Sequence, residues 1–163
     1  MWALCYLTLF QWSPRPFWAW RRWLLCVFGA KIGRQTRIHN NARVYFPWRF
    51  RIGEHSAIGE HALIYNLGSI EIGDYVTVSQ RAHLCAGTHD YSTRKMPLIR
   101  AKIVLQDDVW ICADAFVGPN VTVCEGAIIG ACAVATSDID AWTIVAGNPA
   151  KAIKLRPRIA PDS

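Results

Sequence analysis

The side chain best suited to moving a proton stands where a regular pattern in the sequence breaks off. His89 lies in residues 87–92 (GTHDYS), and an imidazole, whose ordinary pKa is about 6.5, can take up and release a proton at neutral pH. Asn66 falls one repeat turn earlier, in a six-residue unit that begins at Ile64, so it can lie on the same face as His89. Asp90 can orient the imidazole ring or cap the loop that follows. These residues predict a polar site suited to acid–base chemistry.

The remaining histidines and the cysteines do not predict a metal site. His83 is six residues before His89, and His55 is six before His61. Residues six apart fall on neighbouring walls of one coil, not directly above one another, which disfavours a metal cluster within one chain. The six cysteines show no C-x-x-C and no spacing typical of zinc sites. We therefore expect no metal, and reduced thiols in a cytosolic protein.

Short repeats of six residues must position these side chains. From Leu105 onward, nearly every sixth residue is aliphatic, and a small or β-branched residue follows four positions after each of them. A unit this short cannot bury its own apolar side chains, so copies must stack into a parallel β-helix, an all-β solenoid. Three units make one triangular turn of 18 residues, which places Ile111 under Ile129. Gly118 and Gly130 are expected at corners that need a positive φ or a close approach of the backbone.

The repeat begins at Lys31 with a period of 20 residues. Ile-Gly pairs recur at that interval, starting at Ile32, Ile52 and Ile72, so three coils precede a break. Residues 90–102 contain no regular hexad and are expected to form one long loop after the third coil. Long excursions from a rigid scaffold often carry function.

The chain divides into an N-terminal aromatic and basic helical cap (residues 1–30), the β-helix (31–151) and a basic C-terminal tail (152–163). Residues 1–51 contain nine Lys or Arg and six of the eight Trp, but no Asp or Glu. The rest of the chain carries nine Lys or Arg against twelve acidic residues. The basic, aromatic start is therefore expected to have a role separate from that of the repeat.

Residues 17–28 are expected to form a helix, with Ser13 as its cap and Gly29 as its stop. This helix either covers the open end of the first coil or lies in a membrane interface, where Trp rings sit among headgroups and Arg meets anionic lipid. The two roles are compatible. Residues 1–10 are apolar, but they lack a basic n-region and are too short to span a bilayer.

Several motifs together resemble the hexapeptide-repeat acyltransferases: the repeat itself, GTHDYS at 87–92, DDVWI at 107–111 and VAGNPAK at 145–151. Residues 13–33 also resemble the N-terminal block of the colanic acid biosynthesis acetyltransferases, and galactoside and maltose O-acetyltransferases are more distantly similar. The resemblance implies a left-handed β-helix, a homotrimer and acetyl-CoA as donor. The left hand comes from the family alone, because the ordinary crossover rule favours right-handed connections.

The resemblance also implies roles for single residues. His89 matches the catalytic general base, Asn66 a residue near the acceptor, and Trp110 a residue lining the cleft between acceptor and coenzyme. Asn66 can instead make a corner hydrogen bond, and Trp110 can be a wall aromatic. The implied coenzyme contacts are the backbone at Ala113 and Ala131, the Thr136 side chain, and Lys151 and Lys154 near the phosphates. Residues 138–141 (DIDA) replace the commoner D-I-P-P turn and bring acidic groups toward these lysines. Gln106 and Cys124 stand where glycine is usual.

The function that the resemblance implies is acetyl transfer to a saccharide hydroxyl. We expect the acceptor to be a nucleotide- or lipid-linked intermediate of surface polysaccharide synthesis at the cytosolic face of a membrane. N-acetylation of an amino sugar would use the same donor groove and differ in acceptor contacts within residues 90–102. A non-catalytic β-helix scaffold would not need His89, Asn66 and Trp110 together. The zinc sites of β-helix carbonic anhydrases need three histidines, and no matching spacing is present. No nucleic-acid partner is expected.

Overall fold

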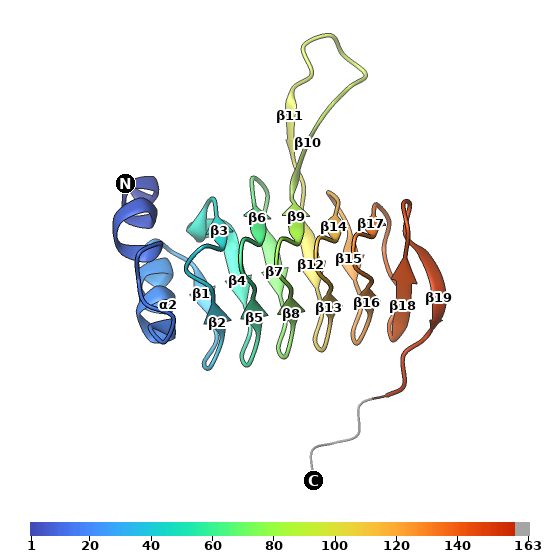
Figure 1. Cartoon of the computed structure of the whole chain (residues 1–163). Coiled ribbons are helices and arrows are strands. Elements are labelled where there is room, and N and C mark those ends of the chain that lie inside the picture. The colour runs from blue at the N-terminus through green and yellow to red at the C-terminus, as the bar shows by residue number, and fades with distance from the viewer. Residues whose placement is uncertain (159–163) are drawn as a thin grey trace.

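Short parallel strands wind into a three-sided solenoid with helices at its N-terminal end (Figure 1). The computed structural model describes residues 1–158. Each side of the solenoid is a sheet built from one strand of each successive coil. The first sheet consists of β1 (Lys31–Ile32), β4 (Phe50–Ile52), β7 (Ile70–Ile72), β12 (Ile103–Leu105) and β15 (Thr122–Val123).

The second sheet is the longest and includes both strands after the last coil. It consists of β2 (Arg37–Ile38), β5 (Ala57–Ile58), β8 (Thr77–Val78), β13 (Trp110–Ile111), β16 (Ile128–Ile129), β18 (Thr143–Ala146) and β19 (Lys151–Leu155). The third sheet consists of β3 (Arg43–Val44), β6 (Leu63–Tyr65), β9 (His83–Cys85), β14 (Phe116–Val117) and β17 (Val134–Ala135). A short 3-10 turn, η2 (Pro47–Arg49), leads from β3 into β4.

The register of the strands confirms the predicted repeat. Ile111 pairs with Ile129, as expected, and Ile38, Ile58 and Val78 continue the same column in the parallel ladder. All five side chains are buried. Because successive side chains of a strand point to opposite faces, the residue before each buried aliphatic faces outward. The repeat therefore sets both the core and the positions at which functional side chains can appear.

Of the two reasons expected for glycine at the corners, the close approach of the backbone is the one that the structure shows. Gly118 and Gly130 do not have a positive φ; they sit where the next coil approaches, so that a Cβ on Gly130 would lie 3.0 Å from the Val145 carbonyl oxygen. The left-handed corner positions are occupied mostly by other residues, including Asp108 and Asp114. Asp and Asn tolerate this conformation because their short polar side chains can hydrogen-bond locally, but Tyr75, Cys132 and Trp142 adopt it as well.

The cap contains two helical segments. α1 (Trp2–Cys5) continues into the π-helical turn η1 (Tyr6–Phe10), and α2 (Trp18–Val27) follows. Gly29, with φ +92°, ends α2 as expected: its N–H bonds to the Cys26 carbonyl, and the next N–H bonds to the Leu25 carbonyl. The prediction of Ser13 as the cap of α2 is wrong. Phe17 holds that position, and the Ser13 hydroxyl donates to the Phe10 carbonyl.

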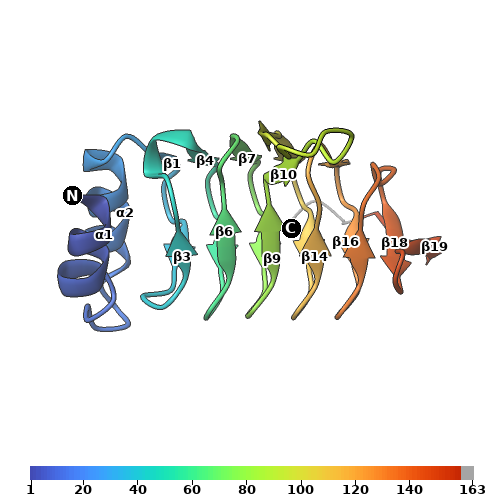
Figure 2. The ribbon, with the colours of Figure 1, turned by 90° about the horizontal axis from the view of Figure 1, so that it is seen from above.

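The cap and the C-terminal strands lie at opposite ends of the solenoid (Figures 1 and 2). Phe10 and Leu25 are buried at the cap end and join the core of the coils. Within residues 1–158, no helix combines the length and apolarity needed to cross a bilayer.

The segment expected as a basic tail is in part a strand. β19 pairs antiparallel with β18, and Arg156 donates to the carbonyls of Asp108 and Gly126 at 2.7 and 3.0 Å. Residues 159–163, the end of that predicted tail, lie outside the described residues.

Candidate active site

His89 is carried by a β-hairpin that projects from the solenoid. β10 (Gly87–His89) pairs antiparallel with β11 (Leu98–Arg100), and the hairpin stands out between β9 and β12 (Figure 1). The excursion was expected as an irregular loop, but its base is regular because residues 98–100 pair with residues 87–89. The hairpin projects from the body of the chain (Figure 1), and His89, the last residue of β10, is exposed.

The His89 ring has a defined tautomer. Its Nδ1 lies 2.6 Å from the Met96 carbonyl oxygen, which can only accept a hydrogen bond, so Nδ1 carries the proton. The lone pair is then on Nε2, on the opposite side of the ring. An imidazole oriented by a carbonyl with a free Nε2 is arranged to accept a proton from a bound group.

Asp90 makes its hydrogen bonds within the hairpin loop. Its Oδ1 accepts from the Ser92 N–H at 2.9 Å and from the Ser92 hydroxyl at 2.5 Å. These two hydrogen bonds lower the pKa of the Asp90 carboxyl below its ordinary value. Of the two roles expected for Asp90, this geometry corresponds to the loop cap, and the Met96 carbonyl orients His89 instead.

Asn66 is buried and bonds to the backbone of the preceding coil. Its Oδ1 accepts from the N–H groups of Tyr45 and Phe46 at 3.2 and 3.0 Å, and its Nδ2 donates to the Phe46 carbonyl at 2.6 Å. These bonds replace backbone pairing where the chain leaves β3 for η2. These are the corner hydrogen bonds that were named as the alternative to acceptor contact.

Trp110 lies on a different side of the solenoid from the hairpin. It occupies the outward position of β13 in the second sheet, and its Nε1–H donates to the Ser79 hydroxyl at 2.9 Å. The hairpin rises from the edge that carries β9, whereas β8 and β13 lie near the opposite edge (Figure 1). One chain therefore does not bring Trp110 to His89.

The residues expected to contact the donor lie in the second sheet, at the corner that follows it, and in the third sheet. On the outer face of the second sheet, Trp110 pairs with Ile128, Ile128 with Ile144, and Ile144 with Lys154, so an indole, two isoleucines and an ammonium form one column. At about 4.8 Å between strands, this column is about 14 Å long. Lys151 pairs with Ala146 in the same hairpin of strands.

Ala113 and Ala131 stack at the corner that follows this sheet, where the Cys132 N–H donates to the Ala113 carbonyl at 3.0 Å. Thr136 is exposed after β17 in the third sheet, away from the column. The acidic turn is also on another side: Asp138 accepts from the Thr122 N–H, next to the first sheet.

The chain is similar over nearly its whole length to a known acetyltransferase. It is 34% identical over 156 residues to "Putative colanic acid biosynthesis acetyltransferase WcaF" of Escherichia coli strain K12, which covers 96% of this chain and 86% of that protein. The chain belongs to the hexapeptide-repeat acetyltransferases. No family model matches it.

Solved structures of hexapeptide-repeat acetyltransferases share the fold. A maltose O-acetyltransferase from Clostridium difficile 630 superposes with a TM-score of 0.86 at 22% identity, over 96% of this chain and 86% of that one. The hexapeptide-repeat acetyltransferase VCA0836 of Vibrio cholerae, complexed with acetyl coenzyme A, superposes with a TM-score of 0.83 at 23% identity, over 96% and 85%. The solenoid is a left-handed parallel β-helix, as the resemblance implied.

A hollow on the second sheet contains functional candidates that the sequence did not indicate. It has a volume of about 590 Å³ and is lined by Trp18, Arg37, His39 and Ser79 among others; the Ser79 hydroxyl is the group to which Trp110 donates. The His39 Nδ1 lies 3.5 Å from a Glu60 carboxylate oxygen, and burial lowers the pKa of His39. The period of 20 residues places His39 and Ser79 in one column. That spacing is the feature of the sequence from which the two residues of this hollow could have been predicted to lie together.

Proposed function

We propose that this acetyltransferase uses acetyl-CoA to acetylate a hydroxyl of a saccharide, with His89 as the general base. The observation that carries this proposal is the hydrogen bond from His89 Nδ1 to the Met96 carbonyl, which leaves Nε2 free to accept a proton. A base near neutral pH is the group that a weakly acidic hydroxyl needs in order to attack a thioester.

The step requires no covalent intermediate on the protein. His89 Nε2 takes the hydroxyl proton as the acceptor oxygen bonds to the thioester carbonyl carbon. The carbon–sulfur bond then breaks, and the coenzyme thiol leaves with the proton that His89 returns. Because the Met96 carbonyl stabilises the Nδ1–H while Nε2 gains its proton, the ring keeps its orientation through both transfers.

The outer column of the second sheet supports a donor groove. Trp110, Ile128 and Ile144 offer an apolar wall to a pantetheine arm, and Lys154 ends the column with a positive charge for phosphate. Further candidate coenzyme contacts are Lys151, which lies on the second sheet, and the backbone of Ala113 and Ala131 at the corner that follows it. Thr136 lies on the third sheet and can reach the same coenzyme only from a neighbouring subunit.

A homotrimer would complete the site. His89 projects on a hairpin away from its own coils, and Trp110 faces outward on another side, so a cyclic arrangement can place the hairpin of one subunit over the second sheet of the next. Asn66 and Asp90 then act as positioning residues, which hold the η2 bend and the hairpin loop. We propose a cytoplasmic enzyme because its donor is cytoplasmic and its six cysteines are free.

Subunit mixing tests the shared site. His89→Ala and Trp110→Ala chains, each weakly active alone, should recover about a quarter of wild-type activity when refolded together in equal amounts, since about one interface in four then has both side chains. Activity that stays at the level of the two separate variants would contradict a site shared between subunits.

Product stability tests the reaction. We expect thiol release from acetyl-CoA with a panel of nucleotide- and lipid-linked saccharides, and a product whose acetyl group is removed by hydroxylamine, as an ester is. An acetylated product resistant to hydroxylamine would show an amide and favour the N-acetyltransferase alternative. Binding of acetyl-CoA without transfer to any such acceptor would weigh against a role in polysaccharide synthesis.

A further inference from the structure

The outer face of α2 is apolar along its length. Trp23 and Val27 are 55% and 60% exposed, and Ala19 and Cys26 share their face at helical spacing. Trp23 stacks on Trp20, with the ring centroids 5.1 Å apart, so the indole is held outward rather than free to fold over the helix. The inner face of α2, with Leu24 and Leu25 buried, already covers the first coil. Capping therefore does not account for the apolar outer face.

The segment before α2 extends this apolar surface. Leu4 and Leu7 are exposed on α1 and η1. A shallow hollow of about 290 Å³ between η1 and the start of α2 is lined mainly by apolar side chains, namely Leu9, Trp12, Pro14, Phe17 and Trp20 with Thr8 and Ser13. We call this surface, from Leu4 to Val27, the end face.

The end-face segment is basic and contains no acid of its own, although Glu60 of the second coil pairs with Arg15. Residues 1–53 contain no Asp or Glu. Arg34 and Arg37, in the first coil, are exposed, and the described residues offer no carboxylate within 4 Å of either one. An apolar surface rich in indoles and rimmed by arginine matches the chemistry of an anionic lipid surface, where aromatic rings lie at the headgroups and arginine meets phosphate.

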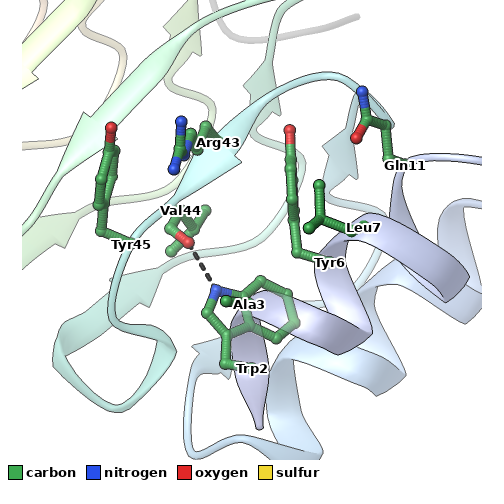
Figure 3. A pocket seen from close by; sticks show the side chains of 8 residues that line it. All are labelled: Trp2, Ala3, Tyr6, Leu7, Gln11, Arg43, Val44 and Tyr45. Carbon is green, nitrogen blue, oxygen red and sulfur yellow. Dashed lines mark hydrogen bonds between the residues drawn. The ribbon is translucent and has the colours of Figure 1, made fainter.

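A second hollow, of about 360 Å³, offers a place for a phosphate group (Figure 3). It lies between η1 and β3, and its wall carries Leu7 from the end face. Tyr6, Arg43 and Tyr45 project side by side into it (Figure 3), with the Arg43 guanidinium 4.5 Å from the Tyr45 ring centre. No described carboxylate pairs with Arg43. A guanidinium flanked by two phenol hydroxyls is suited to a lipid phosphate.

We infer that the end face docks on an anionic lipid bilayer, with Trp23, Val27 and the residues of the apolar hollow in the interface and Arg34, Arg37 and Arg43 at the phosphates. The cap then contacts the membrane, and β19 lies at the distal end of the solenoid. This inference is independent of the proposed acetyl transfer. A second copy of the chain fits the face less well, because two such basic ends would repel each other.

Vesicle sedimentation tests the docking with the full chain and no coenzyme. We expect binding to phosphatidylcholine vesicles that contain about a third phosphatidylglycerol, with weaker binding to phosphatidylcholine alone and in high salt. The double variant Trp23→Ser/Val27→Ser should lower partitioning at least tenfold. Its matched control is Ile153→Ser/Leu155→Ser, which removes two apolar side chains that are at least as exposed, at the distal end, and should leave partitioning unchanged.

The basic rim is tested in the same assay. Arg34→Gln/Arg37→Gln should weaken binding by about fivefold for each arginine. Arg94→Gln/Lys95→Gln removes the same charge from the exposed hairpin loop and should have little effect. Arg43→Gln should reduce binding to anionic vesicles without altering binding to phosphatidylcholine alone. Equal losses for the rim and hairpin variants would show a non-specific charge effect and overturn the docking geometry.

A probe distinguishes the two ends even if a helix variant folds poorly. Cys26 lies on the end face and Cys132 at a corner near the distal end, and both are exposed and free. A polarity-sensitive fluorophore on Cys26, in a Cys132→Ser chain, should shift to the blue on anionic vesicles, and the reverse labelling should not. Equal shifts, or no shift, would overturn the inference. The inference would also be overturned if the wild-type chain did not bind vesicles but associated end to end, and if Trp23→Ser/Val27→Ser abolished that association.

Discussion

The buried guanidinium of Arg21 is expected to hold the cap to the solenoid. Its Nε donates to the Ile38 carbonyl at 2.6 Å, and its other nitrogens donate to the Ser13 hydroxyl and to the Pro14 and Arg15 carbonyls at 2.6–2.9 Å. Arg21 is fully buried, and burial lowers its pKa. One side chain thus links the start of α2, the linker before it and the first coil.

The stability that Arg21 contributes can be estimated from these hydrogen bonds. A hydrogen bond from a charged donor contributes about 1.5–3 kcal/mol, but the Pro14 and Arg15 carbonyls are only partly buried and can regain water. We therefore expect Arg21→Met to lower the free energy of unfolding by about 3–5 kcal/mol. The neighbouring Arg22 makes one bond, to the Thr36 carbonyl at 3.0 Å, so Arg22→Met should cost about 1 kcal/mol or less.

Urea unfolding at fixed protein concentration, followed by circular dichroism, measures the free energy of unfolding of the Arg21→Met and Arg22→Met variants. Limited proteolysis should also cut Arg21→Met faster near residues 14–16, because the linker loses its donors. If Arg21→Met and Arg22→Met differ by less than about 1 kcal/mol, the guanidinium does not fasten the cap and the reasoning from its buried bonds is wrong.

Two further predictions concern a corner and a half-buried histidine. Gly126 has φ +67°, and a Cβ there would lie 2.5 Å from the Trp142 ring. Gly147 has φ +94°, but the nearest atom to its Cβ would be 3.5 Å away, so Gly126→Ala should lower thermal stability more than Gly147→Ala. Equal losses of stability would show that backbone strain alone matters. Burial lowers the pKa of His83, so the unfolded chain binds its proton at a higher pH than the folded chain does. The free energy of unfolding should fall as the pH drops below about 6.5, by at most about 1.4 kcal/mol per pH unit for this residue. His83→Phe should reduce that slope in urea titrations at several pH values, and an unchanged slope would assign it to other groups.

The core of the solenoid was predictable because the repeat leaves little freedom. Every sixth residue must be aliphatic to stack, and the pairing of Ile111 with Ile129 follows from counting along the chain. The corners were less predictable, since polar and aromatic residues alike adopt the left-handed conformation that glycine also allows. Asp108 and Asp114 do so here.

Elements outside the repeat depended on contacts that no period encodes. β19 forms because residues 151–155 fold back on β18 and Arg156 reaches two carbonyls of earlier coils, while the sequence shows only a basic segment. Likewise, GTHDYS indicated His89, but the acceptor of its Nδ1–H is a main-chain carbonyl, which any residue at position 96 would supply. The sequence could therefore place the candidate base without indicating what orients it.

The turnover number of His89→Ala tests the central claim most directly. With a saccharide acceptor that the wild type acetylates, we expect kcat to fall by about 10²–10⁴-fold. Binding of acetyl-CoA, measured by calorimetry, should stay unchanged, and Tyr91→Ala, a control at an exposed position in the same hairpin loop, should keep most of its activity. A His89→Ala enzyme whose kcat stays within a few-fold of the wild type would contradict the assignment of His89 as the general base.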